Sequence, residues 1–435
     1  MTPYAASSKT DRFSVCCLKT DHILLFAIDS GEHVCYHRPE QIFGGDSAVK
    51  LKWPRTKDNR SEEKRPWWMG ILTVAMLAAT CWMGLHQMSE PAEAASPLPA
   101  RTRRSVLYVM DQSNLNLTDV MAAQVDQVNY SFALIEDGKA TGRHWQGIRQ
   151  MSAFLRRHPD IDGVLSVGGW GADGFSDAAA TEAGRKKLAD SILALMDEHG
   201  FRGVDLDWEY PGSSAAGIKS RPEDVENWYK LLAVLREGLD ERQARSGQKY
   251  ILSVALGAGE SQLSKIDGAR LGRLVDQAVV MAYDLKGFDR ITGHHAGLYP
   301  GGKQKDSGAY AVKRLIDSGL SKKKILLGIP AYGRVWRQVS GGGDGMGQRA
   351  ATAGNRTMDY PDIQALESKG YTRHYDEKAQ AAWWFDGSTF VSGEDEVSLA
   401  AKTAWLREQG LLGVAVWEWR HADGGDILAI LSNDL

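Results

Sequence analysis

The segment GVDLDWEYP, residues 203–211, alternates acidic and apolar side chains. Successive side chains on a β-strand point to opposite faces, so we expect Asp205, Asp207 and Glu209 to share one face and the apolar residues between them to share the other. A solvated edge strand with acidic decoration is the alternative. It does not explain a strict alternation that ends in an aromatic residue and a proline, so we interpret the segment as part of a functional site.

The three carboxylates predict a particular chemistry. Carboxylates turned toward a packed interior are costly unless they are hydrogen-bonded or protonated. No Lys or Arg within the strand neutralises them, and like charges this close cannot all ionise, so at least one pKa is expected to be raised. A carboxyl group that stays protonated near neutral pH is what a general acid requires.

Similar apolar, β-branched runs recur along the rest of the chain and predict further strands. They are SVLYVM (105–110), QVNYSFAL (127–134), GVLSVGG (163–169), YILSVAL (250–256), QAVVMAY (277–283), KILLGIP (324–330) and LGVAVW (412–417). Helix-period stretches lie between them, such as 223–245, where apolar residues repeat at three and four. Eight strands with intervening helices predict an α/β fold, a (β/α)8 TIM barrel, with a doubly wound open sheet as the alternative. Barrel active sites lie at the carboxyl ends of the strands, where Glu209 falls.

The spacing between the last two predicted strands is too long for one helical crossover. It holds the glycine-rich segment GGGDGMG (341–347) and the strand-like pieces YTRHYD, AAWWF and STFV. The glycine spacing matches neither the phosphate-binding nor the dinucleotide-binding motif, so we interpret it as a connector. We expect a small α+β insert at about 338–395.

Composition limits the class of protein. The chain has 435 residues, 43% of them apolar and 25% charged, which excludes a mainly disordered, collagen-like or polytopic membrane protein. The net charge of −3 gives no global basic field, so we expect no nucleic-acid partner.

The amino-terminal part predicts export. Residues 67–85 carry no charge, and the segment 67–86 is about as long as the ~20 residues that cross a bilayer as a helix. Basic residues precede it and none follows before Arg101, so 1–66 are expected in the cytoplasm as a region of unknown role. After a linker at 87–103, the domain 104–435 would lie outside the cytoplasm. The protein would be membrane-anchored by a single pass, or secreted after cleavage near Ala92-Glu93-Ala94.

Metal-dependent catalysis and serine-based nucleophilic catalysis have less support in the sequence. Carboxylates also bind Mg²⁺ or Mn²⁺, but no H-E-x-x-H or clustered ligand set accompanies them, and no G-x-S-x-G marks a nucleophilic serine. His294 and His295 are adjacent, and we expect them on a loop surface. We predict neither a metal nor a cofactor.

The chain from about Ser105 to its end resembles glycoside hydrolase family 18, the chitinase family, and its insert resembles the α+β insertion domain of bacterial chitinases. The family signature D-x-x-D-x-D-x-E is matched at Asp205, Asp207 and Glu209, with Arg202 in place of the first Asp. Other family landmarks follow in order: Ser166-Val167-Gly168-Gly169 with Trp170, Met281-Ala282-Tyr283-Asp284, Gly328-Ile329-Pro330-Ala331-Tyr332-Gly333-Arg334, Trp417 and Tyr108.

The resemblance implies a substrate-assisted, retaining hydrolysis. Glu209 would be the general acid and base, Asp207 would orient the 2-acetamido group of the sugar, and Asp205 would share a proton with Asp207. Tyr283 and Asp284 would hold the acetamido oxygen and nearby hydroxyls. The implied substrate-binding residues are Trp417, Trp170, Tyr108, Ser166, Met281, Tyr332 and Arg334, although Trp417 and Trp170 could also be ordinary packing residues.

The resemblance implies a chitinase acting on chitin or chito-oligosaccharides, polymers or oligomers of β-1,4-linked N-acetylglucosamine. Two alternatives stay open at this point. One is a hydrolase of another N-acetylhexosamine glycan, such as peptidoglycan or an N-glycan core. The other is a non-catalytic chitin-binding lectin, against which the presence of both Glu209 and Asp207 counts.

Overall fold

The computed structural model describes residues 103–435 and, before them, only three short strands. The chain divides into two units, 1–96 and 97–435. In the first unit an antiparallel sheet has the order β1 (Cys17–Lys19), β2 (His22–Asp29), β3 (Glu32–Tyr36). The proposed membrane or signal segment at 67–86 lies outside the described residues, and so does nearly all of the linker. No helix among the residues that are described is long and apolar enough to span a bilayer.

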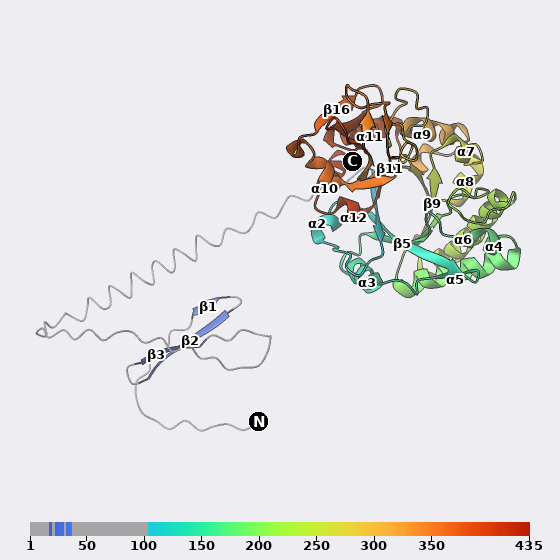
Figure 1. Cartoon of the computed structure of the whole chain (residues 1–435). Coiled ribbons are helices and arrows are strands. Elements are labelled where there is room, and N and C mark those ends of the chain that lie inside the picture. Colours follow the sequence, from blue (N-terminus) through green and yellow to red (C-terminus); the bar gives the residue numbers. More distant parts are fainter. Residues whose placement is uncertain (1–16, 20–21, 30–31, 37–102) are drawn as a thin grey trace, which may run out of the picture. The chain divides into compact units, whose positions relative to one another are not determined.

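The second unit is built around a closed parallel barrel of eight strands, drawn in Figure 1 with its helices around it. Its strands are β4 (Arg104–Met110), β5 (Gln127–Glu136), β7 (Asp162–Gly168), β8 (Gly203–Asp207), β9 (Ile251–Gly257), β10 (Gln277–Met281), β11 (Ile325–Pro330) and β19 (Gly413–Trp417). The pairing of β4 with β5 closes the barrel, and the short β6 (Lys139–Thr141) pairs with β5 as an antiparallel hairpin. The predicted barrel and all eight of its strands are confirmed.

Helices cover the outside of the barrel and bury one large apolar core against it. The longer ones are α3 (Ile148–Arg157), α5 (Glu182–His199), α6 (Asp224–Ser246), α8 (Gly268–Leu274), α9 (Gly308–Asp317), α11 (Glu396–Gln409) and α13 (Ile427–Asp434). Short helices are α2 (Asp119–Ala122), α4 (Phe175–Ala179), α7 (Glu260–Leu263), α10 (Tyr360–Gln364) and α12 (Trp419–Ala422), with 3₁₀ turns η1 (Lys322–Lys324) and η2 (Glu367–Lys369).

Local sequence signals set the ends of these helices. At the start of α5 the Thr181 side chain accepts a hydrogen bond from the Gly184 N–H, and the helix ends at Gly200, whose φ of 78° favours glycine. A capping box of Asp395 and Ser398 starts α11.

The interior of the barrel has a polar half and an apolar half. The buried polar residues come from the neighbouring strands β5, β7, β8, β9 and β10: Gln127, Asn129, Ser131, Ser166, Asp205, Asp207, Ser253 and Gln277. An apolar cluster from β4, β10, β11 and β19 fills the other half: Val106, Tyr108, Val279, Leu326 and Ala415. The acidic strand β8 therefore lies among side chains that can donate hydrogen bonds to it.

The insert is a second sheet that follows β11 almost at once. Its order is β15 (Arg356–Asp359), β12 (Tyr332–Trp336), β18 (Phe390–Gly393), β17 (Ala381–Phe385), β16 (Thr372–Asp376), and a hairpin of β13 (Val339–Ser340) and β14 (Arg349–Ala350) frames the glycine-rich loop. The expected range of 338–395 holds all of this sheet except β12. The chain enters the insert after a single residue, Ala331, so Tyr332 and Arg334 belong to the insert sheet.

Candidate active site

Asp205 and Asp207 of β8 and Glu209, two residues beyond the end of this strand, form a row that runs from the barrel interior to its carboxyl end. Asp205 is fully buried, and its Oδ2 accepts hydrogen bonds from Tyr108 Oη at 3.0 Å and Ser166 Oγ at 2.5 Å. Asp207 is also buried, and the Oδ1 atoms of both aspartates have no hydrogen-bond partner among the described residues. Glu209 is the outermost of the three and lines a cavity. The order matches the predicted arrangement.

Burial raises the pKa of every member of this row. Burial is the largest cause for Asp205, although hydrogen bonds from Ser166 and Tyr108 oppose it. Burial, followed by the charges of Glu209 and Asp205, raises the pKa of Asp207 well above its ordinary value. Burial also raises the pKa of Glu209 to about 7. Such a carboxyl group is protonated over part of the neutral range, which suits a proton donor.

The cavity next to Glu209 has a volume of about 580 Å³ and lies at the carboxyl ends of the barrel strands. Nine of the twelve predicted site residues line it: Trp170, Asp207, Glu209, Met281, Tyr283, Asp284, Tyr332, Arg334 and Trp417. The other three, Tyr108, Ser166 and Asp205, are buried, and their hydrogen bonds make them the support of the acidic row. The structure thus brings all twelve residues together.

Aromatic side chains form much of the cavity wall. The Trp417 ring stacks on Phe132 at 5.7 Å and meets the Tyr108 ring edge-on at 5.5 Å. Trp170 is 61% exposed, which is high for so large an apolar side chain and leaves its ring free to stack on a ligand. Phe288, which was not predicted, is equally exposed and also lines the cavity.

Asp284 is held as an anion in this wall. Arg334 Nε donates to its Oδ1 at 2.7 Å and Arg334 Nη2 donates to its Oδ2, which makes a bidentate pair. Buried His295 places Nδ1 3.6 Å from the same carboxylate. Burial opposes ionisation of Asp284, but His295 and Arg334 together lower its pKa. The site therefore combines a protonated acid and a fixed anion.

The expectation that His294 and His295 lie on a loop surface is wrong. Both are buried: His294 Nε2 is 3.1 Å from Asp376 Oδ2 in the insert, and His295 packs on Tyr332 at 5.3 Å. The insert covers the loop that carries them, and no sequence pattern indicates that contact. His295 becomes part of the support for Asp284.

One glycine lets β7 and β8 approach closely at the site. Gly168 has a φ of +114°, and a Cβ there would lie 2.1 Å from the Asp207 carbonyl oxygen. Only glycine fits such a position. The close packing of the two strands that carry Ser166 and Asp207 thus requires the first glycine of the S-x-G-G segment, Gly168.

His421 is a second cavity residue that sequence reasoning missed. It follows β19, lines the cavity, and places Nδ1 2.6 Å from Asp359 Oδ1 in the insert. No motif marks it, and only its position shortly after Trp417 could have drawn attention to it.

Among the described residues, no group of three or more His, Cys, Asp or Glu side chains is arranged to hold a metal ion.

A row of buried acids that opens into an aromatic-lined cavity at the carboxyl end of a parallel barrel defines a glycan-cleaving barrel enzyme. The chain belongs to glycosyl hydrolases family 18, whose profile matches residues 104–422. It is accordingly a glycoside hydrolase, similar to chitinases.

Three relatives illustrate the similarity. Chitinase A1 of Niallia circulans is 30% identical over 373 residues, which cover 78% of this chain and 51% of that protein, so the chain spans about half the length of this relative. The structure of a family 18 N-acetylglucosaminidase from Paenibacillus barengoltzii matches with a TM-score of 0.74 and 34% identity, over 77% of this chain and 100% of the other. Chitinase ChiW of Paenibacillus sp. str. FPU-7, described as a cell-surface-expressed multi-modular enzyme, matches with a TM-score of 0.70 and 30% identity, over 76% of this chain and 42% of the other.

Proposed function

We propose that this protein hydrolyses β-1,4-linked N-acetylglucosamine chains, with chitin or chito-oligosaccharides as substrates, and that Glu209 is the general acid and base. The observation that carries the proposal is the position of Glu209: it lies beyond two buried aspartates at the outer end of the row, is itself partly buried, and lines the cavity, where burial raises its pKa to about 7. A donor with this pKa stays protonated up to neutral pH and can transfer its proton to the glycosidic oxygen.

The proposed mechanism is substrate-assisted and retaining. Glu209 protonates the leaving oxygen while the carbonyl of the 2-acetamido group attacks C1. Water then opens the oxazolinium ion, with Glu209 as base. Asp207 orients the acetamido N–H and stabilises its positive charge, and Asp205 shares a proton with Asp207, supported by the hydrogen bonds from Tyr108 and Ser166.

The remaining residues hold the sugar. Tyr283 and Asp284 bind the acetamido oxygen and nearby hydroxyls, and the ion pair with Arg334 keeps Asp284 charged and fixed in place. Trp417 supplies the aromatic floor and the exposed Trp170 a platform at the rim. Met281 and Tyr332 complete the wall.

A second candidate is release of single N-acetylglucosamine units from chain ends. It is favoured by the match to a family 18 N-acetylglucosaminidase over the whole of that chain. Both candidates use the same acid and the same acetamide pocket, so the products formed from defined chito-oligosaccharides distinguish them. Monosaccharide as the first product supports the second candidate.

Hydrolysis of a fluorogenic chitobioside tests the assignment of Glu209. We expect Glu209→Gln to lower kcat by about 10²–10⁴-fold while the substrate still binds. Glu377→Gln, at an exposed position in the insert, is the matched control and should behave as wild type. Equal turnover by Glu209→Gln and wild type would refute the assignment, and binding without turnover by the wild type would favour a lectin.

We also propose the domain organisation predicted above: a cytoplasmic region at 1–66, a membrane or signal segment at 67–86, a linker at 87–103 and an exported catalytic domain at 104–435. Similarity to a cell-surface-expressed chitinase supports export. Protease treatment of intact cells tests it, because an exported domain is digested and a cytoplasmic one is protected.

A further inference from the structure

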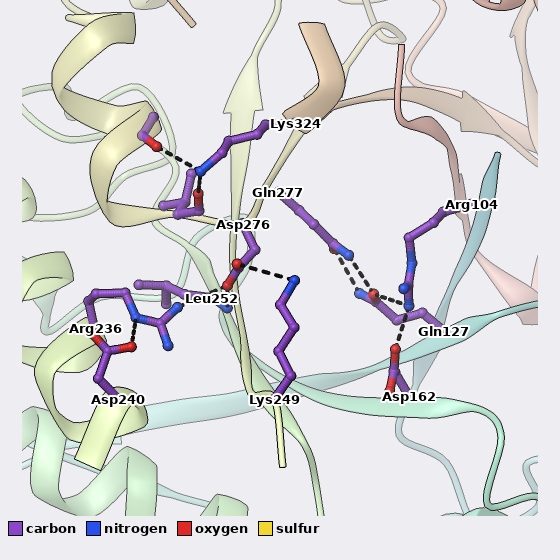
Figure 2. A network of polar contacts seen from close by, with 12 residues as sticks. Arg104, Gln127, Asp162, Arg236, Asp240, Lys249, Leu252, Asp276, Gln277 and Lys324 are labelled. Atoms are coloured by element: carbon purple, nitrogen blue, oxygen red, sulfur yellow. Dashed lines mark hydrogen bonds and ion pairs between the residues drawn. The ribbon is translucent and has the colours of Figure 1, made fainter. Parts of the chain in front are cut away.

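A second cavity, of about 470 Å³, lies at the end of the barrel opposite the active site. Its lining comes from the points where barrel strands begin: Arg104, Asp162, Lys249, Ile251, Asp276, Gln277, Ser321, Lys323, Lys324 and Leu412. Figure 2 shows most of its polar groups. The amino ends of barrel strands normally serve stability, so a cavity with this many charges requires an explanation.

Cations outnumber acids around this cavity. Arg104, Lys249, Lys323 and Lys324 face only Asp162 and Asp276, which gives a net charge of +2 from the residues that line it.

Both acids are already engaged by arginine. Asp162 Oδ2 accepts from Arg104 Nη2 at 2.5 Å. Asp276 Oδ2 accepts from Arg236 Nη1 and from the Leu252 N–H, both at 2.9 Å. Figure 2 shows these contacts. In the part of the chain that the structure describes, only Lys249 of the three lysines has a carboxylate partner, Asp276, which it shares with Arg236.

The lysines differ in their structural roles. Lys324 Nζ donates to the carbonyl oxygens of Gly272 and Val275, each at 2.7 Å, and so ties the end of α8 to β11. Lys249 is 72% exposed and lies 3.7 Å from Asp276 Oδ1, too far for a hydrogen bond. Lys323 has no hydrogen bond or ion pair within 103–435. Within 103–435, Lys323 thus borders the cavity without a partner, and Lys249 has only the long ion pair with Asp276.

The floor of the cavity is closed by amides. Gln127 and Gln277 donate to each other at 3.1 and 2.8 Å, so this buried pair is satisfied and separates the cavity from the barrel interior. Arg104 adds a buried Nε that has no partner among the described residues. A ligand here would meet more donors than acceptors, because arginine already engages both carboxylates of the lining.

We propose that this cavity is a binding site for a phosphate group. The net charge of +2 matches a phosphate dianion, and separate ammonium groups suit a tetrahedral oxyanion, because Lys binds phosphate as a point charge that needs no planar geometry. A carboxylate has one charge and two oxygens, and it would leave one of the two exposed lysines, Lys249 or Lys323, unmatched. A bound dianion also relieves the repulsion among the cations.

The phosphate has two possible carriers of the same chemistry. One is inorganic phosphate. The other is the phosphomonoester head group of phosphatidate, which can also carry two negative charges, because the linker at 87–103 joins the barrel at Arg104, on this same end, and follows the proposed membrane segment. The lipid carrier rests on the proposed domain organisation, whereas the cavity itself does not.

Isothermal titration calorimetry of the full-length protein tests the site, with inorganic phosphate as one ligand and sn-glycerol 3-phosphate, the deacylated head group of phosphatidate, as the other. Sodium chloride at equal ionic strength measures the screening contribution. Lys249→Gln/Lys323→Gln changes two exposed side chains and leaves Lys324 and both arginine pairs in place, so it should fold. Lys378→Gln, an exposed lysine of the insert, is the matched control.

We expect phosphate to bind wild type and Lys378→Gln alike, and the double variant about tenfold more weakly. Tighter binding of inorganic phosphate identifies the free phosphate ion as the ligand, and tighter binding of glycerol 3-phosphate identifies the monoester head group. Absence of binding beyond the chloride control, or equal affinity in the double variant, overturns the proposal. Chitobioside hydrolysis by the double variant should equal that of wild type, since the lysines lie at the other end of the barrel from Glu209.

Discussion

Replacement of Glu209 by Gln is expected to stabilise the fold while it removes activity. Burial raises the pKa of this carboxyl from 4.5 to about 7. Each pKa unit corresponds to about 1.4 kcal/mol, so above neutral pH the wild type carries a penalty of about 3 kcal/mol that glutamine does not.

The sign of the pH dependence follows from linkage. Below pH 4.5 the carboxyl is protonated in the folded and unfolded states, so its ionisation does not lower the free energy of unfolding. As pH rises from 4.5 through 7, the unfolded chain releases the proton before the folded protein does, so the wild type loses stability relative to Glu209→Gln. Above about pH 7 the difference in the free energy of unfolding between wild type and Glu209→Gln is constant.

Urea denaturation at pH 4.5, 6 and 8 measures this difference in the free energy of unfolding. Glu377→Gln is the control, because an exposed glutamate should leave the pH dependence of wild type unchanged. If wild type and Glu209→Gln lose stability in parallel from pH 4.5 to 8, the glutamate is not held in a desolvated position, and the reasoning about the proton donor is refuted.

Other predictions test the neighbours of this residue and the domain boundary. The kcat/KM of wild type should fall as pH rises above about 7, where Glu209 loses its proton; activity that persists unchanged at pH 9 would contradict the pKa. Asp207→Asn should slow cleavage by about 10²-fold and shift the acidic limb of the pH–rate profile, whereas an unshifted limb would show that the two acids are not coupled. Gly168→Ala should lower the free energy of unfolding by about 1–3 kcal/mol, because its Cβ would meet the Asp207 carbonyl; thermal melts should show a smaller loss for Gly200→Ala, where no atom lies within 4 Å. Removal of residues 1–100 should leave a soluble, active enzyme by size-exclusion chromatography and chitobioside assay, and an aggregated or inactive fragment would place the boundary elsewhere.

The barrel was predictable because each of its strands is a short apolar run that pattern alone identifies. The acidic row was predictable for a related reason, since the alternation in β8 fixes which side chains share a face. The roles proposed for its three members rest on their depth, and the structure gives that depth as full burial of Asp205 and Asp207 and partial burial of Glu209.

Contacts between distant segments could not be predicted in the same way. The pair of Asp284 and Arg334 joins β10 to the insert across fifty residues, and β12 is recruited to the insert sheet by pairing with β15 and β18. Burial of His295 depends on that same sheet. These features arise from packing between elements, which leaves no periodic trace in the sequence.

The barrel and the insert each contribute a different part of the cavity wall. The three acids of the row, with Tyr108 and Ser166 that hydrogen-bond Asp205, belong to the barrel, whereas Tyr332 and Arg334, the partner of Asp284, lie on a sheet that begins one residue after β11. Remodelling of that sheet would change the shape of one wall without moving Glu209. Substitutions that change which sugars bind can therefore accumulate in the insert sheet while the acidic row of the barrel stays the same.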